Sequence, residues 1–129
     1  MTTPTGDIIS RARYVSLVTY RRDGSEVATP VWIAACGEKF YIFSESRGGK
    51  VKRLRNNSQV RLAKCDMRGE VLTDWREAHG TLVDDEHTID KAYRALRQKY
   101  GWQMRLADFF SKLTGRYDQR SMLEIKLHG

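Results

Sequence analysis

The sequence has few cysteines, few prolines and no long apolar run, and each shortage excludes a class of protein. Its two cysteines, Cys36 and Cys65, can form at most one bridge, which excludes a disulfide framework and a zinc site with four soft ligands. No segment approaches the ~18 to 20 consecutive apolar residues of a bilayer span, so we expect no membrane protein. The first thirteen residues lack the basic start and apolar stretch of a secretory signal. We therefore expect a cytoplasmic protein with a single domain over residues 1–129.

Acidic residues are absent from residues 47–64, although the whole chain carries sixteen of them. Twenty-three Lys and Arg residues give a formal net charge of +7, and seven of them lie in this segment: Arg47, Lys50, Lys52, Arg53, Arg55, Arg61 and Lys64. The other sixteen basic residues balance the sixteen acidic ones. The net charge therefore lies in one segment, which indicates a local anion site in an otherwise neutral protein. A solvated basic surface is the plainer alternative.

The apolar pattern predicts a mainly β protein with six antiparallel strands. A strong hairpin signal, Asp23-Gly24, separates the first two strands, and Gly37 marks the next turn. Pro30 interrupts the second strand and indicates a sheet edge or a bulge, and Gly80 suggests a bulge in the fifth. The expected strands are Tyr14–Tyr20, Val27–Ala35, Lys39–Ser44, Val60–Cys65, Glu77–Val83 and Ser121–Leu127.

Helical spacing predicts short helices between these strands. A basic helix over 50–57 places Val51 and Leu54 on one face, and a longer one over 86–100 begins at Asp84 or Asp85 and ends at Gly101. A weak helix is expected over 7–12, and a further one from 102 to 115. Antiparallel strands with short inserted helices, and no parallel βαβ alternation, favour a small six-stranded antiparallel split β-barrel.

The passage from Ser44 to Arg53 holds the best candidate for binding chemistry. It combines hydroxyl groups, a glycine turn, the start of a helix and basic side chains, which together suit a phosphate. Other signals are weaker: no nucleophile motif is present, and no ligand spacing indicates a metal. His79, His87 and His128 lie far apart in the sequence, so we expect three isolated structural or surface histidines.

Several of these passages together resemble a known family. The segments Tyr14–Tyr20, Ala28–Trp32, Lys39–Ile42 and Gly49–Asn57 are similar to the pyridoxamine 5'-phosphate oxidase-like (PPOX-class) family of FMN-binding split β-barrels, and most similar to its branch of coenzyme F420-dependent oxidoreductases. The resemblance implies a homodimer that binds a deazaflavin in a groove at each subunit boundary. The chain stops soon after its last strand, without the C-terminal Arg and His set of pyridoxamine phosphate oxidase itself, so vitamin B6 oxidation is not expected.

The resemblance also assigns residues. Lys50 matches the lysine that holds the cofactor phosphate, with Ser44, Arg47 and Lys52 as its neighbours. Four residues match the strand beside the tricyclic ring: Thr29, Pro30, Val31 and Trp32. Arg53, Arg55 and Arg61 are assigned to the polyglutamate tail of the cofactor.

The resulting hypothesis is an oxidoreductase that passes a hydride from reduced coenzyme F420 to an electron-poor double bond of a small substrate. The cofactor supplies the chemistry, so no catalytic residue is predicted and solvent or a hydroxyl can give the proton. Two alternatives stay open: FMN as the cofactor, and a non-catalytic carrier of the deazaflavin. Nucleic-acid binding ranks third, because no recognition motif accompanies the basic helix.

Overall fold

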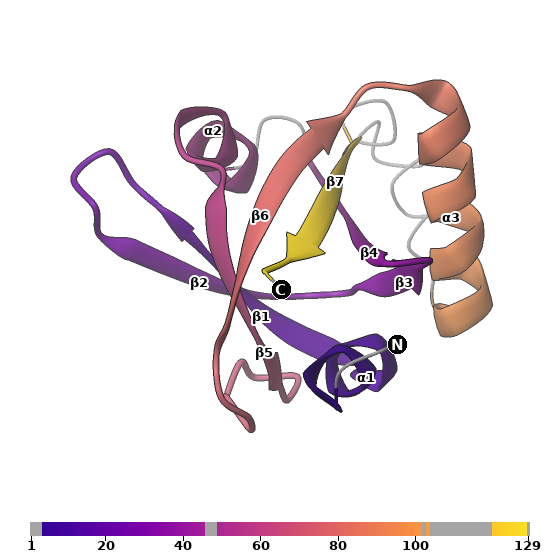
Figure 1. The fold of residues 1–129 in the computed structure, drawn as a ribbon, viewed down its shortest axis with the longest axis horizontal. Helices are drawn as coiled ribbons and strands as arrows, with labels where there is room; N and C mark the ends of the chain where they lie inside the picture. The colour runs from indigo at the N-terminus through magenta and orange to yellow at the C-terminus, as the bar shows by residue number, and fades with distance from the viewer. Residues whose placement is uncertain (1–3, 46–48, 102, 104–119, 129) are drawn as a thin grey trace.

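The computed structural model describes residues 4–45, 49–101, 103 and 120–128, which form one curled antiparallel sheet with helices against it (Figure 1). The strand order in the described sheet is β2-β1-β5-β6-β7-β4-β3. Its elements, in chain order, are α1 (Pro4–Arg11), β1 (Tyr14–Tyr20), β2 (Glu26–Val31), β3 (Ala34–Cys36), β4 (Lys39–Glu45), α2 (Gly49–Asn56), β5 (Gln59–Cys65), β6 (Arg76–Val83), α3 (Glu86–Tyr100) and β7 (Arg120–Leu127).

The single strand expected over 27–35 is wrong, because this segment forms two strands. β2 pairs with β1 and β3 pairs with β4, so the described sheet has seven strands and not six. Ile33 lies between them, and its backbone N–H and carbonyl are both within hydrogen-bond distance of the Tyr100 hydroxyl, at 2.9 and 3.1 Å. The end of α3 therefore occupies the backbone groups that a continuous ladder would need.

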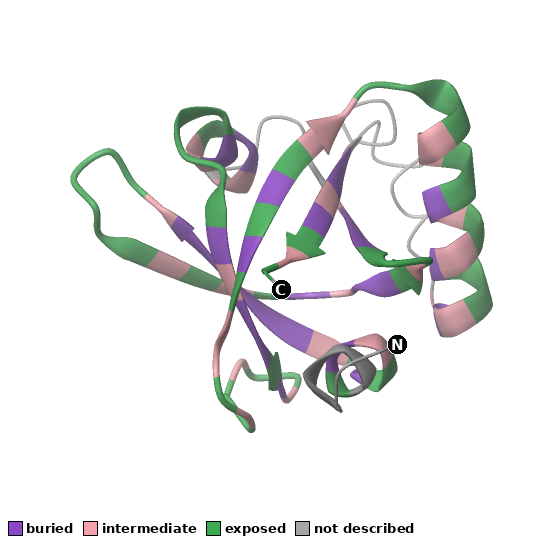
Figure 2. Ribbon diagram, viewed as in Figure 1, coloured by how far each residue is buried: buried purple, intermediate pink, exposed green. Residues whose placement is uncertain are grey.

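Two hydrophobic clusters stabilise the sheet. The first fills the inside of the curl with alternate residues of the strands, among them the fully buried Leu17, Ile42 and Leu62 (Figure 2). The second joins the outer face of β3, β4 and β7 to α3, and includes Leu96 and Tyr100. Since side chains alternate between the two faces of a strand, one sheet can serve both clusters.

The prediction of a helix over 86–100 is confirmed. The Asp85 carboxylate caps α3 by accepting a hydrogen bond of 2.6 Å from the Thr88 N–H, and Gly101 follows the last turn with φ 56°. Except for Gln103, the helix expected from 102 to 115 lies outside the described residues. Among the described helices, none has both the length and the apolar character that crossing a membrane requires.

Gly80 does not form the expected bulge. The pairing of β6 with β7 runs without interruption from Ala78 opposite Leu127 to Val83 opposite Met122. A Cβ at Gly80 would lie 3.1 Å from a methyl carbon of Leu54 in α2. The glycine therefore allows α2 to pack closely on the inner face of β6, and this contact sets the height of the basic helix above the sheet.

Candidate functional site

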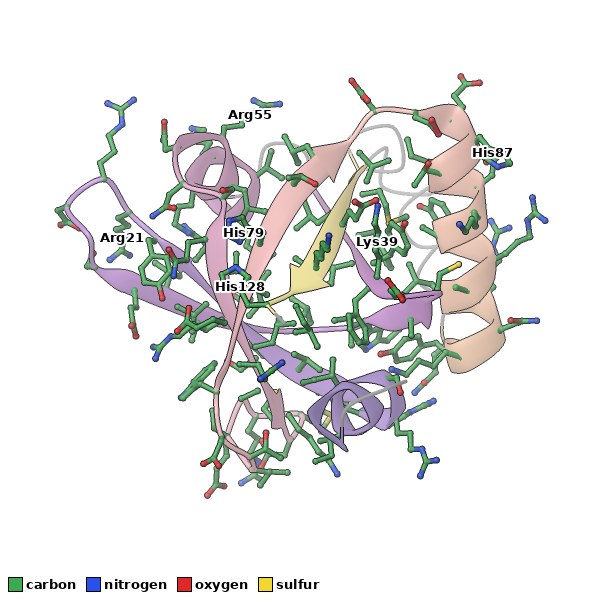
Figure 3. The ribbon with its side chains drawn as sticks, in the orientation of Figure 1. Arg21, Lys39, Arg55, His79, His87 and His128 are labelled. Atoms are coloured by element: carbon green, nitrogen blue, oxygen red, sulfur yellow. The ribbon has the colours of Figure 1, made fainter. Side chains whose placement is uncertain are left out.

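α2 lies at one end of the sheet and carries four basic residues of the acid-free segment. Val51 and Leu54 are buried, as the spacing predicted, whereas Lys52 and Arg55 are exposed. Figure 3 shows Arg55 on the solvent side of the helix. Because α2 contains no acidic residue, all of its charged side chains are positive.

Arg53 joins this helix to β1. Its Nε donates a hydrogen bond of 2.5 Å to the hydroxyl of Thr19, which is fully buried. Burial lowers the pKa of Arg53, and the positive charge of Arg21 lowers it further. Asp23, two residues after Arg21 in the turn, accepts hydrogen bonds from both the backbone N–H and the hydroxyl of Ser25. The charge of Arg21 therefore disfavours the charge of Arg53, and an anion bound near both guanidinium groups would stabilise both.

No ion pair within the described residues involves Arg53. The ion pairs found there are Lys39 with Glu124 and Arg61 with Glu26. The sequence analysis did not identify Thr19 or Arg21 as part of this site. The available signal was Thr19 itself, a polar residue two positions after Leu17 on a strand face that is otherwise apolar.

β2 and β4, the strand that precedes α2, do not pair with each other. β3 pairs with β4 from Ala34 opposite Tyr41 onward, and the same register continued would place Val31 opposite Ser44. β2 pairs with β1 instead, so within the described chain its other edge has no strand partner. Figure 1 shows β2 and β3 following one another along one path across the molecule. The position of Pro30 in an edge strand is therefore confirmed.

The four residues expected beside a ring divide between the two faces of β2. Thr29 lies opposite Leu17 and Val31 opposite Val15, so both point toward the inside of the curl. Pro30 alternates to the other face and is exposed, with Gly69 close to its ring. Trp32, just beyond β2, stacks on Tyr100 with ring centroids 4.7 Å apart and an interplanar angle of 11°. One face of the indole is therefore already covered.

A polar network fixes the backbone between β2 and β3. Besides the Tyr100 contacts, the Lys99 ammonium donates a hydrogen bond of 2.5 Å to the Ile33 carbonyl, and Arg13 donates to the Lys99 carbonyl at 3.0 Å. Burial lowers the pKa of Lys99 to about 8, with a further contribution from the charge of Arg13. Burial likewise raises the pKa of Tyr100 to about 12. The sequence analysis missed this network, which holds Trp32 in place.

The structure brings some predicted residues together and separates others. Lys50, Lys52, Arg53 and Arg55 share α2, and Ser44 lies at the end of the strand that precedes it. Arg61 is separated from them, because it pairs with Val18 and so faces the side of the sheet opposite to Thr19. There it binds Glu26 and lies over the ring of Trp75 at 4.9 Å. Arg47 lies outside the described residues.

Residues 4–128 match a protein family described as pyridoxamine 5'-phosphate oxidase. The chain belongs to this family. Its curled antiparallel sheet with few short helices confirms the expected fold class, the mainly β split barrel. Among curated proteins, no significant sequence match is found.

Solved structures share the fold at low sequence identity. HutZ, a heme storage protein from Vibrio cholerae, superposes with a TM-score of 0.68 at 11% identity over 95% of this chain and 87% of that one. A FAD-binding protein from Mesorhizobium loti gives 0.62 at 17% over 95% and 84%. An F420 reductase gives 0.58 at 18% over 100% and 97%. At these identities the likeness shows the family fold and does not assign a cofactor.

Proposed function

We propose that this member of the family is an F420-dependent oxidoreductase, which passes a hydride from the reduced cofactor to an electron-poor double bond of a small substrate. The carrying observation is the acid-free helix α2, which holds Arg53 on Thr19 of β1, the strand that pairs with the edge strand β2. A phosphate needs several donors that converge on its oxygens, and a charged arm needs further cations nearby. The donor set of α2 fits both requirements.

Each part of the site has a separate task in this proposal. Lys50 and Lys52 hold the cofactor phosphate, with Ser44 and Arg47 from the preceding segment. Arg53 and Arg55 bind the negatively charged tail, and Arg53 does so from a position fixed by Thr19.

The strand edge orients the ring. The ring lies along the edge of β2 that has no strand partner in the described chain, beside Thr29, Pro30 and Val31. Trp32 closes one end of this site. A bound reduced deazaflavin supplies the hydride, from carbon C5 of its ring. The protein would orient this ring toward the substrate, and solvent or a hydroxyl would give the proton that completes the reduction, so no acid or base residue of its own is needed.

The direct test is a titration of the purified protein with coenzyme F420, followed by tryptophan fluorescence. We expect saturation at micromolar cofactor. Lys50→Ala should weaken binding by about 1.5 to 3 kcal/mol, the usual contribution of a charge-assisted hydrogen bond, which is about 10-fold to 150-fold in Kd. Lys91→Ala, which removes an exposed lysine from α3, is the matched control and should leave Kd unchanged. An unchanged affinity in Lys50→Ala would show that the phosphate binds elsewhere.

FMN is the alternative cofactor, and the FAD-binding neighbour of the same fold gives it some support. Oxidised flavins and deazaflavins both absorb visible light, so the mass of the cofactor released from the denatured protein distinguishes them, and the mass of FMN would favour the flavin. A carrier without catalysis is the other alternative, since a storage protein also has this fold. Binding of F420 without turnover across a panel of enones and quinones would favour the carrier.

We further propose that the active form is a homodimer. Ile8 and Leu72 are 40% and 56% exposed, and with Val71 and Trp75 they line a groove of about 590 Å³. Thr73, Asp74 and Arg76 complete the lining, so apolar side chains lie beside polar ones, as they do in many protein interfaces. Light scattering on the eluting protein should give twice the 14.9 kDa chain mass, and Leu72→Glu should reduce it to the monomer mass.

A further inference from the structure

Two of the three histidines, expected to be isolated, are in contact. His79 lies in β6 opposite Lys126, and His128 follows two residues later, so both rings lie on the same face of the β6–β7 ladder. Nδ1 of His79 and Nε2 of His128 face each other in a hydrogen bond, with ring centroids 4.4 Å apart. Figure 3 shows the two rings side by side and His87 far away on α3. The expectation failed because a gap of 49 residues separates the two in the sequence.

We propose that His79 and His128 together bind a divalent transition-metal ion such as Zn²⁺, Cu²⁺ or Ni²⁺. In the hydrogen bond, one ring nitrogen carries a proton and the other offers its lone pair. A metal ion takes the place of that proton and accepts lone pairs from both nitrogens. With metal–nitrogen distances of about 2.0–2.1 Å in tetrahedral geometry, the nitrogens stand about 3.3 Å apart. Both side chains are exposed, so small rotations can provide this separation.

The backbone holds the pair in place before any ion binds. The His128 N–H donates to the Glu77 carbonyl at 3.1 Å, and the His128 carbonyl accepts from Arg76 at 2.7 Å. His79 lies within β6. Since both ligands lie on ordered backbone, binding an ion costs little conformational entropy. A hollow of about 500 Å³, lined by His79, Lys126, Leu127 and His128, has room for an ion with its water ligands.

The surroundings limit the strength of the site. Lys126 opposes a cation, and Glu77 on the same face accepts a hydrogen bond of 3.1 Å from Gln59. Within the described residues, no group of three His, Cys, Asp or Glu side chains surrounds an ion, so water completes the coordination. The site is also separate from the proposed cofactor site, because Gly80 and α2 lie on the inner face of β6 and His79 lies on the outer face. Its failure would leave the proposed function untouched.

Calorimetric titration of the untagged protein with ZnCl₂ at about pH 7.5 tests the proposal. We expect one ion per chain. His79→Gln and His128→Gln should each weaken binding by about tenfold or more. His87→Gln, the third histidine, is the matched control and should bind as the wild type does.

A second measurement does not depend on variants that fold. Electron paramagnetic resonance of the wild-type protein with one equivalent of Cu²⁺ should show hyperfine coupling to two imidazole nitrogens. The proposal is overturned by the absence of saturable Zn²⁺ binding, or by a loss in His87→Gln equal to that in His79→Gln. A stoichiometry of one ion per two chains would also overturn it, because the ion would then bridge two copies.

Discussion

Substitution of Gly80 by alanine tests how closely α2 packs on the sheet. The new Cβ would lie 3.1 Å from methyl carbons of Ile125 and Leu54 and 3.4 Å from one of Val60. Carbon atoms in good contact stand about 3.5–4.0 Å apart. All three neighbours are at most 5% exposed, so none can turn toward solvent. The substitution therefore adds a methyl group to a filled core.

The expected loss of stability follows from two opposing effects. Overpacking costs about 1–3 kcal/mol. The φ angle of Gly80 is not positive, so alanine accepts its backbone and gains about 0.4–1 kcal/mol through the lower entropy of the unfolded chain. The net effect of Gly80→Ala is a loss between about 0 and about 2.6 kcal/mol in the free energy of unfolding, centred near about 1.3 kcal/mol. Urea denaturation followed by tryptophan fluorescence measures it.

A double-mutant cycle identifies the cause of the loss. Leu54→Ala alone should cost about 2–5 kcal/mol, because it leaves a cavity under α2. In the double variant, the methyl group added at position 80 occupies part of that cavity. The combined loss in the free energy of unfolding should therefore be smaller than the sum of the two single losses by more than about 0.5 kcal/mol. Additive losses, or a Gly80→Ala protein more stable than the wild type, would refute the close packing of α2 on β6.

Three further predictions concern α3. Tyr100→Phe leaves the Ile33 N–H without its partner, which should lower the free energy of unfolding by about 1–3 kcal/mol in urea denaturation. The wild-type protein should gain thermal stability relative to Lys99→Met as the pH rises from about 8 to 10.5. Over that range the unfolded chain keeps the proton on Lys99, whereas the folded chain releases it. A difference in melting temperature that stays constant with pH would contradict this prediction. Asp85→Ala should lower the melting temperature at neutral pH. The difference in melting temperature from the wild type should shrink as the pH falls below 3.8, because the hydrogen bonds with Thr88 lower the pKa of Asp85 and are lost when Asp85 is protonated.

Local patterns were sufficient to predict several elements. The bounds of α3 follow from its apolar spacing together with Asp85 and Gly101, all of which lie within or next to the helix. The burial of Val51 and Leu54 likewise follows from their separation by three residues on a short helix. In each case the residues that decide the structure are neighbours in the chain.

Contacts between distant segments explain what the sequence analysis missed. The division between β2 and β3 depends on Tyr100, which lies 67 residues from Ile33. The anchoring of Arg53 depends on Thr19, 34 residues earlier. A pattern confined to one segment carries no information about these partners, so the analysis could predict which helix is basic but not what positions its side chains.

Pro30 has a second consequence for the behaviour of the protein in concentrated solution. An unpaired strand edge can add a strand from another molecule, which is how many sheets begin to aggregate. Proline has no N–H, so a foreign strand laid along β2 meets a missing donor at Pro30. Pro30 thus makes the unpaired edge of β2 a poor template for polymerisation.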